Sequence, residues 1–208
     1  MSDTHPPQPM PPTHENAATR SRHWSDWLLS AAALLISAVS LWVAFDTQKS
    51  NRALVAEAAW PFVQVFTSGG NDTPRVLTLN MSNAGIGPAK IKSFEVFWNG
   101  HAYASTAALM KDCCGLTRAD GMLGTSSVAG TVLRPGDSVP LIRFVQSDAN
   151  EASWSAFRAQ RFKLTHRICF CSVLDECWLT RPQALADTQD LEPPKVDACP
   201  VPAVSFAD

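Results

Sequence analysis

The sequence is poor in charged side chains. Asp, Glu, Lys and Arg make up 17% of the 208 residues, where about 25% is usual in soluble domains. The 17 basic and 19 acidic side chains leave a net charge of −2. This balance argues against nucleic-acid binding, because that function requires a basic patch or stripe. The length also excludes a complete TIM barrel, which needs about 250 residues.

The motifs of common catalytic sites are missing as well. The glycines do not form a G-x-G-x-x-G or Walker pattern, and neither G-x-S-x-G nor H-E-x-x-H occurs. The second half of the chain contains His166 on the apolar side of an alternating segment. We interpret it as a hydrogen-bonded core residue rather than a catalytic base. We therefore predict no catalytic residue, no metal site and no cofactor.

One long hydrophobic run is present near the amino terminus. Residues 27–45 (WLLSAAALLISAVSLWVAF) contain no charged side chain. As a helix they would span roughly 28 Å, which matches the ~30 Å hydrocarbon core of a bilayer. Trp24 and Trp42 add the aromatic residues typical of both membrane interfaces. We predict a transmembrane helix, capped by Ser25, that acts as an uncleaved signal anchor; a buried core helix and a cleaved signal peptide are the alternatives.

The rest of the chain divides into four further parts. Residues 1–26 are rich in proline and poor in aliphatic side chains, so we expect a disordered tail. Residues 46–59 contain good helix formers, so we expect a juxtamembrane helix. We assign residues 60–182 to a β-sandwich domain and 183–208 to a C-terminal tail tethered by a disulfide.

Charge alone does not orient the predicted span. Arg20 and Arg22 precede it, and Lys49 and Arg52 follow it, so the positive-inside rule gives no clear answer. All six cysteines follow the span, which favours an oxidising compartment for the domain. We expect a single-pass protein of a bacterial inner membrane, with its C-terminal domain in the periplasm.

Beyond Trp60 the hydrophobic pattern has a period of two, which is typical of β-strands. The candidate strands are 61–66, 75–83, 90–98, 101–104, 127–137, 138–146, 161–173 and 177–180. Asn99-Gly100 is a strong hairpin signal. One short helix is expected at 148–160, capped by Asp148. The pattern predicts a mainly β fold, an immunoglobulin-like antiparallel β-sandwich preceded by a transmembrane helix, with an α+β layer as the alternative.

The most distinctive loop is NAGIGPAK. Asn83 and Gly85 suit positive φ, Gly87 permits close approach of another backbone, and Pro88 fixes the start of the next strand. We interpret the stretch as a loop between strands rather than a phosphate-binding site.

This loop also carries a resemblance. The run N-x-G-x-G-P-A, preceded by an apolar helix and the Trp60-Pro61 pair, resembles many uncharacterised bacterial single-pass membrane proteins. The segment LRPGDSV resembles a turn seen in the same kind of domain. The likeness covers about residues 28–145 and implies an envelope protein with an immunoglobulin-like exported domain. It implies no catalytic residue.

The cysteines form the most informative pattern. Residues 161–172 alternate, with apolar side chains from Phe162 to Phe170 on one face and the Cys169 and Cys171 side chains on the other. Only the apolar face can contact the core, so both cysteines should point away from it. A hairpin centred on Leu174 sets Phe170 opposite Trp178 and Cys171 opposite Cys177.

We therefore predict a disulfide between Cys171 and Cys177. Cys169 would then pair either with the Cys113-Cys114 segment or with Cys199. Six cysteines permit fifteen pairings, so the sequence leaves these assignments open. Residues 105–130 and the C-terminal tail lack strand patterns, so covalent tethers would order them. A zinc site, a redox-active pair and a vicinal Cys113–Cys114 bond are alternative interpretations, although no Cys-x-x-Cys spacing occurs.

Small residues repeat at spacings of three and four along the apolar run. They are Ser30, Ala33, Ser37, Ser40 and Ala44. Such a stripe permits helices to self-associate in a bilayer, although small residues are abundant throughout this segment.

The expected partners are the lipid bilayer and another protein or a second copy of the helix, not nucleic acid. The leading hypothesis is a non-enzymatic envelope protein that presents a disulfide-bonded β-sandwich for protein–protein interaction. The alternatives are a small-ligand sensing module coupled to the membrane helix and a membrane-tethered enzyme.

Overall fold

The computed structural model describes residues 18–69, 73–117, 123–187 and 192–207. The chain forms two compact units, with the boundary between Ala53 and Leu54. The described residues of the first unit belong to helix α1, and the strands and other helices that the structure describes lie in the second unit.

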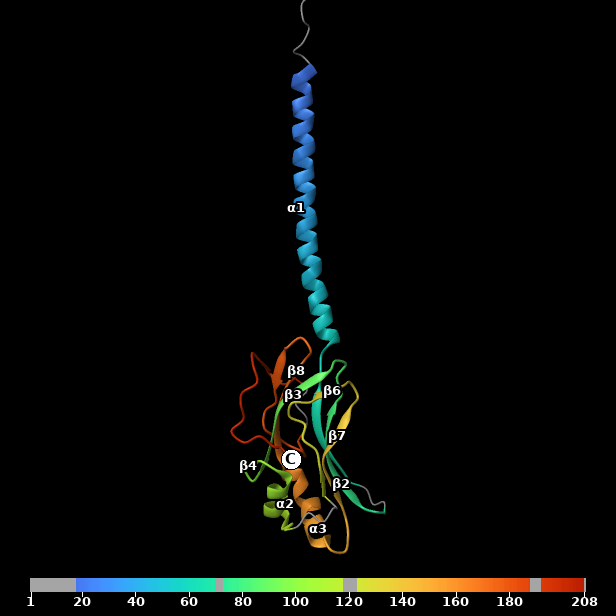
Figure 1. The fold of residues 1–208 in the computed structure, drawn as a ribbon, viewed down its shortest axis with the longest axis vertical. Coiled ribbons are helices and arrows are strands. Elements are labelled where there is room, and N and C mark those ends of the chain that lie inside the picture. Colours follow the sequence, from blue (N-terminus) through green and yellow to red (C-terminus); the bar gives the residue numbers. More distant parts are fainter. Residues whose placement is uncertain (1–17, 70–72, 118–122, 188–191, 208) are drawn as a thin grey trace, which may run out of the picture. The chain divides into compact units, whose positions relative to one another are not determined.

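Helix α1 extends from Ala18 to Ala58 (Figure 1). Its stretch from Trp24 to Ala58 is long and apolar enough to cross a membrane, and none of its most hydrophobic window is buried. The predicted apolar and juxtamembrane helices are thus one continuous helix, because no proline or glycine interrupts the sequence.

The start of α1 corrects two predictions. Residues 18–26 are helical rather than part of a disordered tail, because they contain no helix breaker. Ser25 consequently lies inside the helix and not at its cap. The remainder of the predicted tail, residues 1–17, lies outside the described residues.

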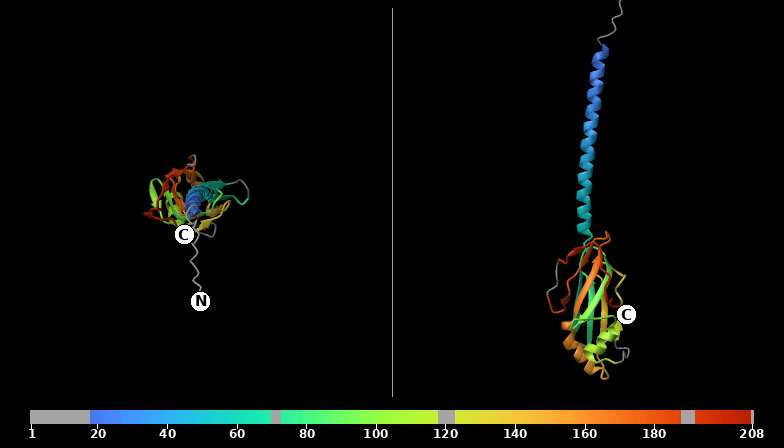
Figure 2. Two further views of the ribbon diagram at one scale, coloured as in Figure 1. Left: turned by 90° about the horizontal axis from the view of Figure 1, so that it is seen from above. Right: turned by 90° about the vertical axis from the view of Figure 1, so that its left-hand side faces the viewer.

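The second unit contains two antiparallel sheets (Figures 1 and 2). The first has the order β1-β2-β7-β5, with β1 at Val63–Gly69, β2 at Val76–Asn83, β7 at Ser138–Val145 and β5 at Leu123–Thr125. The second has the order β11-β9-β8-β3-β4, with β11 at Lys195–Val196, β9 at Cys177–Leu179, β8 at Thr165–Cys171, β3 at Ala89–Trp98 and β4 at His101–Tyr103. Two short strands complete it: β10 at Gln183–Ala184 pairs with β8, and β6 at Val132–Leu133 pairs with β3.

The alternating residues of both sheets meet in one core. Leu77, Leu79 and Met81 of β2 are buried, as are Phe94 and Val96 of β3, which confirms the predicted faces of these strands. Each such side chain stabilises the fold by roughly 1.5–3 kcal/mol when it leaves water. The described part of the domain is therefore sandwich-like.

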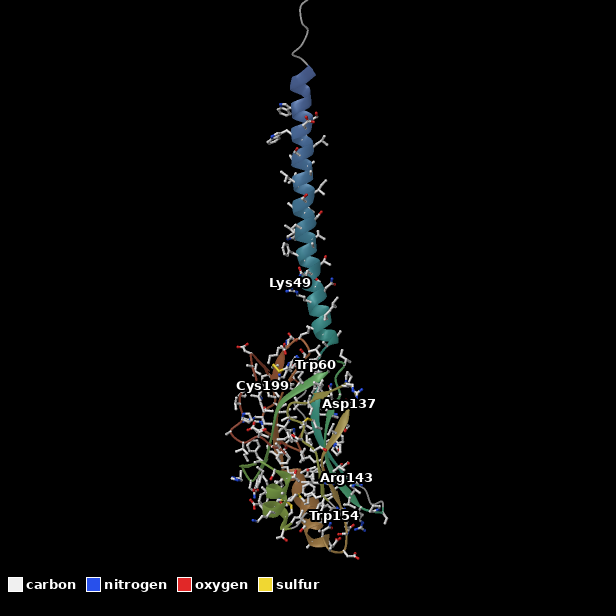
Figure 3. All side chains as sticks on the ribbon, in the orientation of Figure 1. Lys49, Trp60, Asp137, Arg143, Trp154 and Cys199 are labelled. Carbon is white, nitrogen blue, oxygen red and sulfur yellow. A yellow bond between two sulfur atoms is a disulfide. The ribbon has the colours of Figure 1, made fainter. Side chains whose placement is uncertain are left out.

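The helices make the fold more mixed than predicted. Besides α1, the described residues include α2 at Thr106–Cys114 and α3 at Glu151–Gln160, followed by a 3₁₀ turn at Arg161–Lys163. Helices α2 and α3 lie together at one end of the strands (Figures 1 and 2). Trp154 of α3 is buried there (Figure 3).

Helix α2 lies in a segment for which no regular structure was predicted. The Ser105 hydroxyl accepts a hydrogen bond from Ala108 N at 3.3 Å, and Gly115 ends the helix with φ of 65°. Serine and glycine at these two positions are recognised start and stop signals. The helix is nine residues long and has no clear apolar stripe, so the hydrophobic periodicity did not reveal it.

Helix α3 begins later than predicted. Its cap residue is Asn150 rather than Asp148. The Asn150 side chain accepts from Ser147 N and donates to the carbonyl oxygen of Val145, which closes a turn before the helix. That turn contains Asp148, so the helix cannot start there.

Two turns are informative about the strand patterns. Asn99 and Gly100 have φ of 50° and 76° and join Trp98 to His101, as expected for a two-residue hairpin. By contrast, the 3₁₀ turn at Arg161–Lys163 interrupts the predicted long strand. Phe162 is therefore 44% exposed and does not share the core face with Phe170.

The C-terminal segment is part of the sandwich rather than a tail outside it. Strands β10 and β11 extend the second sheet. Phe206 is buried against Phe94, with ring centroids 5.8 Å apart, and its backbone N–H donates to the Phe94 carbonyl at 2.9 Å. Single short pairings of two residues leave no periodic signal in the sequence, which is why they were missed.

Candidate functional site

The β8–β9 hairpin has the register that its sequence predicts. Phe170 faces Trp178 and Cys171 faces Cys177, and the two aromatic rings stack at 5.7 Å. Cys171 and Cys177 form a disulfide across a Cα separation of 4.0 Å. The loop closes with a hydrogen bond from Ser172 N to Glu176 O at 2.8 Å, and Asp175 takes φ of 61°.

The structure decides between the two partners left open for Cys169. It pairs with Cys199, 30 residues further along the chain. Strand β11 pairs with β9, which brings the following residues across the outer face of β8. Cys113 and Cys114 instead pair with each other at the end of α2. Every cysteine of the chain is therefore in a disulfide.

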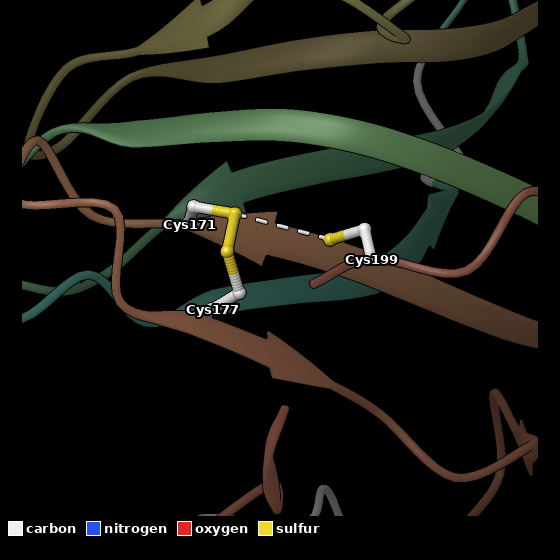
Figure 4. Close-up of side chains that lie close together, drawn as sticks. All are labelled: Cys171, Cys177 and Cys199. Carbon is white, nitrogen blue, oxygen red and sulfur yellow. Dashed lines mark hydrogen bonds between the residues drawn. A yellow bond between two sulfur atoms is a disulfide. The ribbon is translucent and has the colours of Figure 1, made fainter. Parts of the chain in front are cut away.

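The sulfur atoms beside the hairpin lie close together. We call Cys169, Cys171, Cys177 and Cys199 the sulfur cluster. The Sγ atoms of Cys171 and Cys199 belong to different disulfides but are 3.9 Å apart (Figure 4). The Sγ atoms of Cys171, Cys177 and Cys199 all lie within 4.8 Å of one another.

Three of the four cysteines of the sulfur cluster are buried, and Cys199 is half-buried. Cys169 and Cys171 project from the face of β8 opposite to Ile168 and Phe170, as their alternation requires. Both are nevertheless buried. The C-terminal segment lies beside them, since Cys199 is bonded to Cys169 and its Sγ atom is 3.9 Å from that of Cys171.

A cleft of about 520 Å³ opens beside this cluster. Its walls include the sulfur-bearing residues Cys171, Cys177 and Cys199, but not Cys169. Charged walls come from Lys92, Asp175 and Asp197. Pro200, Val201 and Pro202 form a further wall, and the side chain of Val201 is 94% exposed.

Ion pairs hold the hairpin loop beside the cleft. Lys90 Nζ is 2.7 Å from Asp175 Oδ1, and this hydrogen bond lowers the pKa of the Asp175 carboxyl group. Lys195 Nζ is 3.1 Å from Glu176 Oε1 and lies over the Trp178 ring at 5.6 Å. Both acidic side chains of the loop are thus neutralised, which leaves the Lys92 ammonium group and the Asp197 carboxylate as the other charged groups of the cleft wall.

A metal would require different chemistry from the disulfides seen here. Thiolate sulfur is the form of cysteine that binds zinc or copper. The described residues contain one grouping of sulfur atoms close enough to hold an ion, namely Cys171, Cys177 and Cys199. Because each of these sulfurs is bonded to another sulfur, the cluster offers no thiolate ligand in this state.

Asn83 of the NAGIGPAK loop has a role that its loop position did not predict. Its side chain is fully buried. The amide oxygen accepts from Phe62 N at 3.2 Å and Gly85 N at 3.0 Å, and the amide nitrogen donates to the carbonyls of Gly87 at 2.8 Å and Leu133 at 3.0 Å. We call this arrangement the Asn83 clamp.

The clamp holds residues 59–62, which connect the end of α1 to β1. Trp60 O accepts from Ile86 N and Gly87 N. A Cβ atom added at Gly87 would lie 2.0 Å from Ala59 O, and one at Gly85 would lie 2.3 Å from Phe62 N. Close approach of backbone therefore requires glycine at both positions, as predicted for Gly87.

The predicted positive φ values in this loop are wrong. Neither Asn83 nor Gly85 is among the residues with positive φ. Asn83 is the last residue of β2, so extended backbone places its amide in the interior. Gly85 is required by contact with residues 60–62 and not by backbone conformation.

His166 is a core residue, but it is not hydrogen-bonded as predicted. It is buried in β8, and neither ring nitrogen has a partner among the described residues. Desolvation of the charged ring lowers the pKa of His166 to about 4. The imidazole is therefore neutral at physiological pH.

A half-buried ion pair was also missed by the sequence analysis. Arg167 and Glu95 face each other across β8 and β3, with contacts of 2.5 and 2.8 Å. Glu95 is buried, and its hydrogen bonds raise the pKa of Arg167. Opposite charges in two alternating strands could have predicted this ion pair, but only if the two strands were already known to be neighbours.

The small-residue stripe lies along α1. All five of its members are exposed. The Ser37 hydroxyl donates to the carbonyl of Ala33 at 2.8 Å, within the helix. Self-association through this stripe stays a prediction.

The comparisons with known proteins place the chain in a family. Residues 27–165 match the family described as Domain of unknown function (DUF8453). The chain belongs to this family. The DUF8453 match runs from the apolar helix to Thr165 and therefore includes the Asn83 clamp, whereas the sulfur cluster lies beyond it. No curated protein and no solved structure matches the chain.

Proposed function

We propose that this DUF8453 protein is a single-pass protein of a bacterial inner membrane whose immunoglobulin-like domain binds another protein in the periplasm. The observation that carries the proposal is the pairing of all six cysteines within the unit that follows an apolar helix. Disulfides persist in oxidising compartments and are rare in the cytosol. An apolar helix of this length provides the anchor.

Exposed apolar side chains support a binding role for the domain. Ile86 and Val132 are 65% and 56% exposed, and both lie next to the start of β3. Leu174, 48% exposed, lies in the hairpin loop whose Cys171 pairs with Lys90 at the same end of β3. Apolar side chains gathered at one end of a domain are typical of surfaces that contact proteins.

Site-specific labelling tests the membrane orientation. Because every native cysteine is paired, a cysteine introduced as Ser205→Cys or Ser2→Cys is the single free thiol. In intact spheroplasts we expect a membrane-impermeant maleimide to label the Ser205 variant at once and the Ser2 variant only after permeabilisation. Labelling in the reverse order would overturn the proposal.

Photo-crosslinking tests the binding surface. A photoreactive amino acid at Leu174 should yield a discrete adduct with another protein in membranes. The matched control is the same substitution at Glu151, an exposed position at the start of α3. Equal adducts at both positions, or none at Leu174, Ile86 and Val132, would contradict a protein-binding role for this end of the domain.

A small-ligand sensor is the second candidate. It is favoured by the cleft of about 520 Å³ and by the direct attachment of residues 59–62 to the domain through the Asn83 clamp. Such a sensor should retain a ligand through mild purification. Mass spectrometry of the material released on denaturation would detect it, and its absence together with a Leu174 adduct would favour the first candidate.

A further inference from the structure

The two disulfides of the sulfur cluster share one chemical neighbourhood. Cys199 Sγ is bonded to Cys169 Sγ, yet it also lies 3.9 Å from Cys171 Sγ (Figure 4). Cys169 and Cys171 are two residues apart on the same face of β8, so Cys199 lies within reach of both. If the Cys171–Cys177 bond were opened, a thiolate at Cys171 would be in contact with the neighbouring disulfide.

The two disulfides differ in their access to solvent. Cys169 is fully buried and does not line the cleft, whereas its partner Cys199 is half-buried and does line it. Cys171 and Cys177 both line it, and Cys177 is the more exposed of the two at 7% against 1%. An attacking thiolate from the cleft can therefore approach either sulfur of the Cys171–Cys177 bond but only the Cys199 sulfur of the other bond, and exchange depends on access as well as on nucleophilicity.

We infer that Cys171–Cys177 is a thiol-capture site, in which a thiol of another molecule opens the bond and the Cys199 disulfide then moves from Cys169 to Cys171. The inference goes beyond the binding role proposed above. It does not depend on which side of the membrane holds the domain.

The exchange balances without an added oxidant or reductant. An incoming thiolate bonds to Cys177 Sγ, and the electron pair of the broken Cys171–Cys177 bond leaves on Cys171 Sγ. That thiolate bonds to Cys199 Sγ, and the pair of the broken Cys169–Cys199 bond leaves on Cys169, which takes a proton from water. One thiol is consumed and one is released, and the number of disulfides is unchanged.

Release of the Cys169 thiol would change the structure around the cleft. Cys169 is buried in β8 beside Leu179, its partner in β9. A thiol there packs as a small apolar group. Moving the tether of Cys199 by two residues along β8 shifts the C-terminal segment that forms one wall of the cleft. Capture of a thiol thus changes the shape of the surface that captured it.

The direct test uses the full-length protein in detergent with reduced glutathione as the probe. After acid quenching, free thiols are alkylated with N-ethylmaleimide and the disulfide-linked peptides are mapped by mass spectrometry. We expect glutathione on Cys177, a peptide linked through Cys171 and Cys199, and alkylated Cys169. Alkylated Cys171 together with an intact Cys169–Cys199 peptide would overturn the inference.

A substitution tests the second step alone. Cys177→Ser leaves Cys171 as a permanent thiol next to Cys199, so without any added thiol the alkylated fraction of Cys169 should rise at least about tenfold over the wild type. The matched control, Cys171→Ser, removes the nucleophile and should leave the Cys169–Cys199 bond intact. Equal alkylation of Cys169 in both variants would contradict transfer through Cys171. Native near-ultraviolet circular dichroism checks that both variants are folded.

A second probe distinguishes the sources of the thiol. A short unstructured peptide with one cysteine replaces glutathione in a parallel reaction. Faster capture of the peptide indicates a protein thiol as the natural partner, and faster capture of glutathione indicates a low-molecular-weight thiol. Capture of neither probe at Cys177 would contradict the inference.

Discussion

Two segments are attached to the sandwich by different chemistry. Residues 59–62 are held by hydrogen bonds to the Asn83 clamp and the backbone of Ile86 and Gly87. The C-terminal segment is held by the Cys169–Cys199 disulfide and by the buried ring of Phe206. The first attachment depends on close fit between backbones, whereas the second depends on a covalent bond and therefore on the state of its sulfur atoms.

This difference predicts which changes each attachment can survive. A buried amide that makes four hydrogen bonds cannot be replaced without leaving several groups unsatisfied. A disulfide restricts the unfolded chain in addition to any contact it makes in the folded state. We therefore expect the N-terminal attachment to be sensitive to single side-chain changes, and the C-terminal one to be sensitive to redox conditions.

The largest effect should come from Gly87→Ala. Its Cβ would meet the backbone of Ala59 at 2.0 Å, so the loop or residues 59–62 must move and the clamp must open. We expect a loss of about 4 kcal/mol or more in the free energy of unfolding. Tryptophan fluorescence during thermal unfolding measures it. Gly124→Ala is the control, because its Cβ would make only ordinary contacts from 3.8 Å, and a similar loss there would refute the explanation.

Asn83→Ala should follow closely. The substitution removes four hydrogen bonds and leaves the part-buried N–H of Phe62 and the buried carbonyl of Leu133 unsatisfied. We expect a loss of about 3–4 kcal/mol, measured as the midpoint of chemical unfolding. Asn80→Ala is the matched control, since that amide donates only to the Thr78 hydroxyl on a half-buried strand face. If the two variants were equally stable, the clamp would have no special role.

The comparison predicts a different response for the disulfides. Cys169–Cys199 joins residues 30 apart, and Cys171–Cys177 joins residues six apart. Loop entropy predicts that Cys199→Ser costs about 3.5 kcal/mol and Cys177→Ser about 2 kcal/mol. Unfolding under non-reducing conditions measures both values. In the presence of a strong reductant the wild type and both cysteine variants should have the same, lower free energy of unfolding. The loss caused by Asn83→Ala should persist unchanged.

Acid should weaken β8, the strand that carries the C-terminal attachment. His166 has a folded pKa of about 4, against about 6.5 when unfolded. The unfolded state therefore binds a proton first, so stability is full above pH 6.5 and falls as the pH drops from 6.5 towards 4, by about 3 kcal/mol. Unfolding midpoints over this range measure the slope. His166→Gln should flatten it, whereas His101→Gln, at an exposed position, should not.

Some features followed from the sequence because they are local. The hairpin register of Phe170 with Trp178 and of Cys171 with Cys177 depends only on alternation and on the length of one short loop. The two-residue turn at Asn99-Gly100 depends on two adjacent residues. Helix α2 was missed for a related reason, because its signals at Ser105 and Gly115 were present but its apolar stripe was weak.

Other features could not follow from local patterns. The burial of Phe206 depends on its contact with Phe94, more than a hundred residues earlier in the chain. The absence of a hydrogen-bond partner for His166 depends on which side chains fill the space around it. Neither the burial of Phe206 nor the missing partner of His166 alters the hydrophobic periodicity of the sequence, so neither could be predicted from it.

The apolar helix, the main strands and the disulfide within the hairpin could be predicted from the sequence, because each depends on neighbours along the chain. The bond from Cys199 to Cys169, the contact of Cys199 with Cys171, and the link that Asn83 makes between residues 59–62 and Leu133 follow instead from the way the whole domain packs. These contacts connect residues tens of positions apart. They form only once the sheets have paired, since the energy of packing rather than local preference selects their partners.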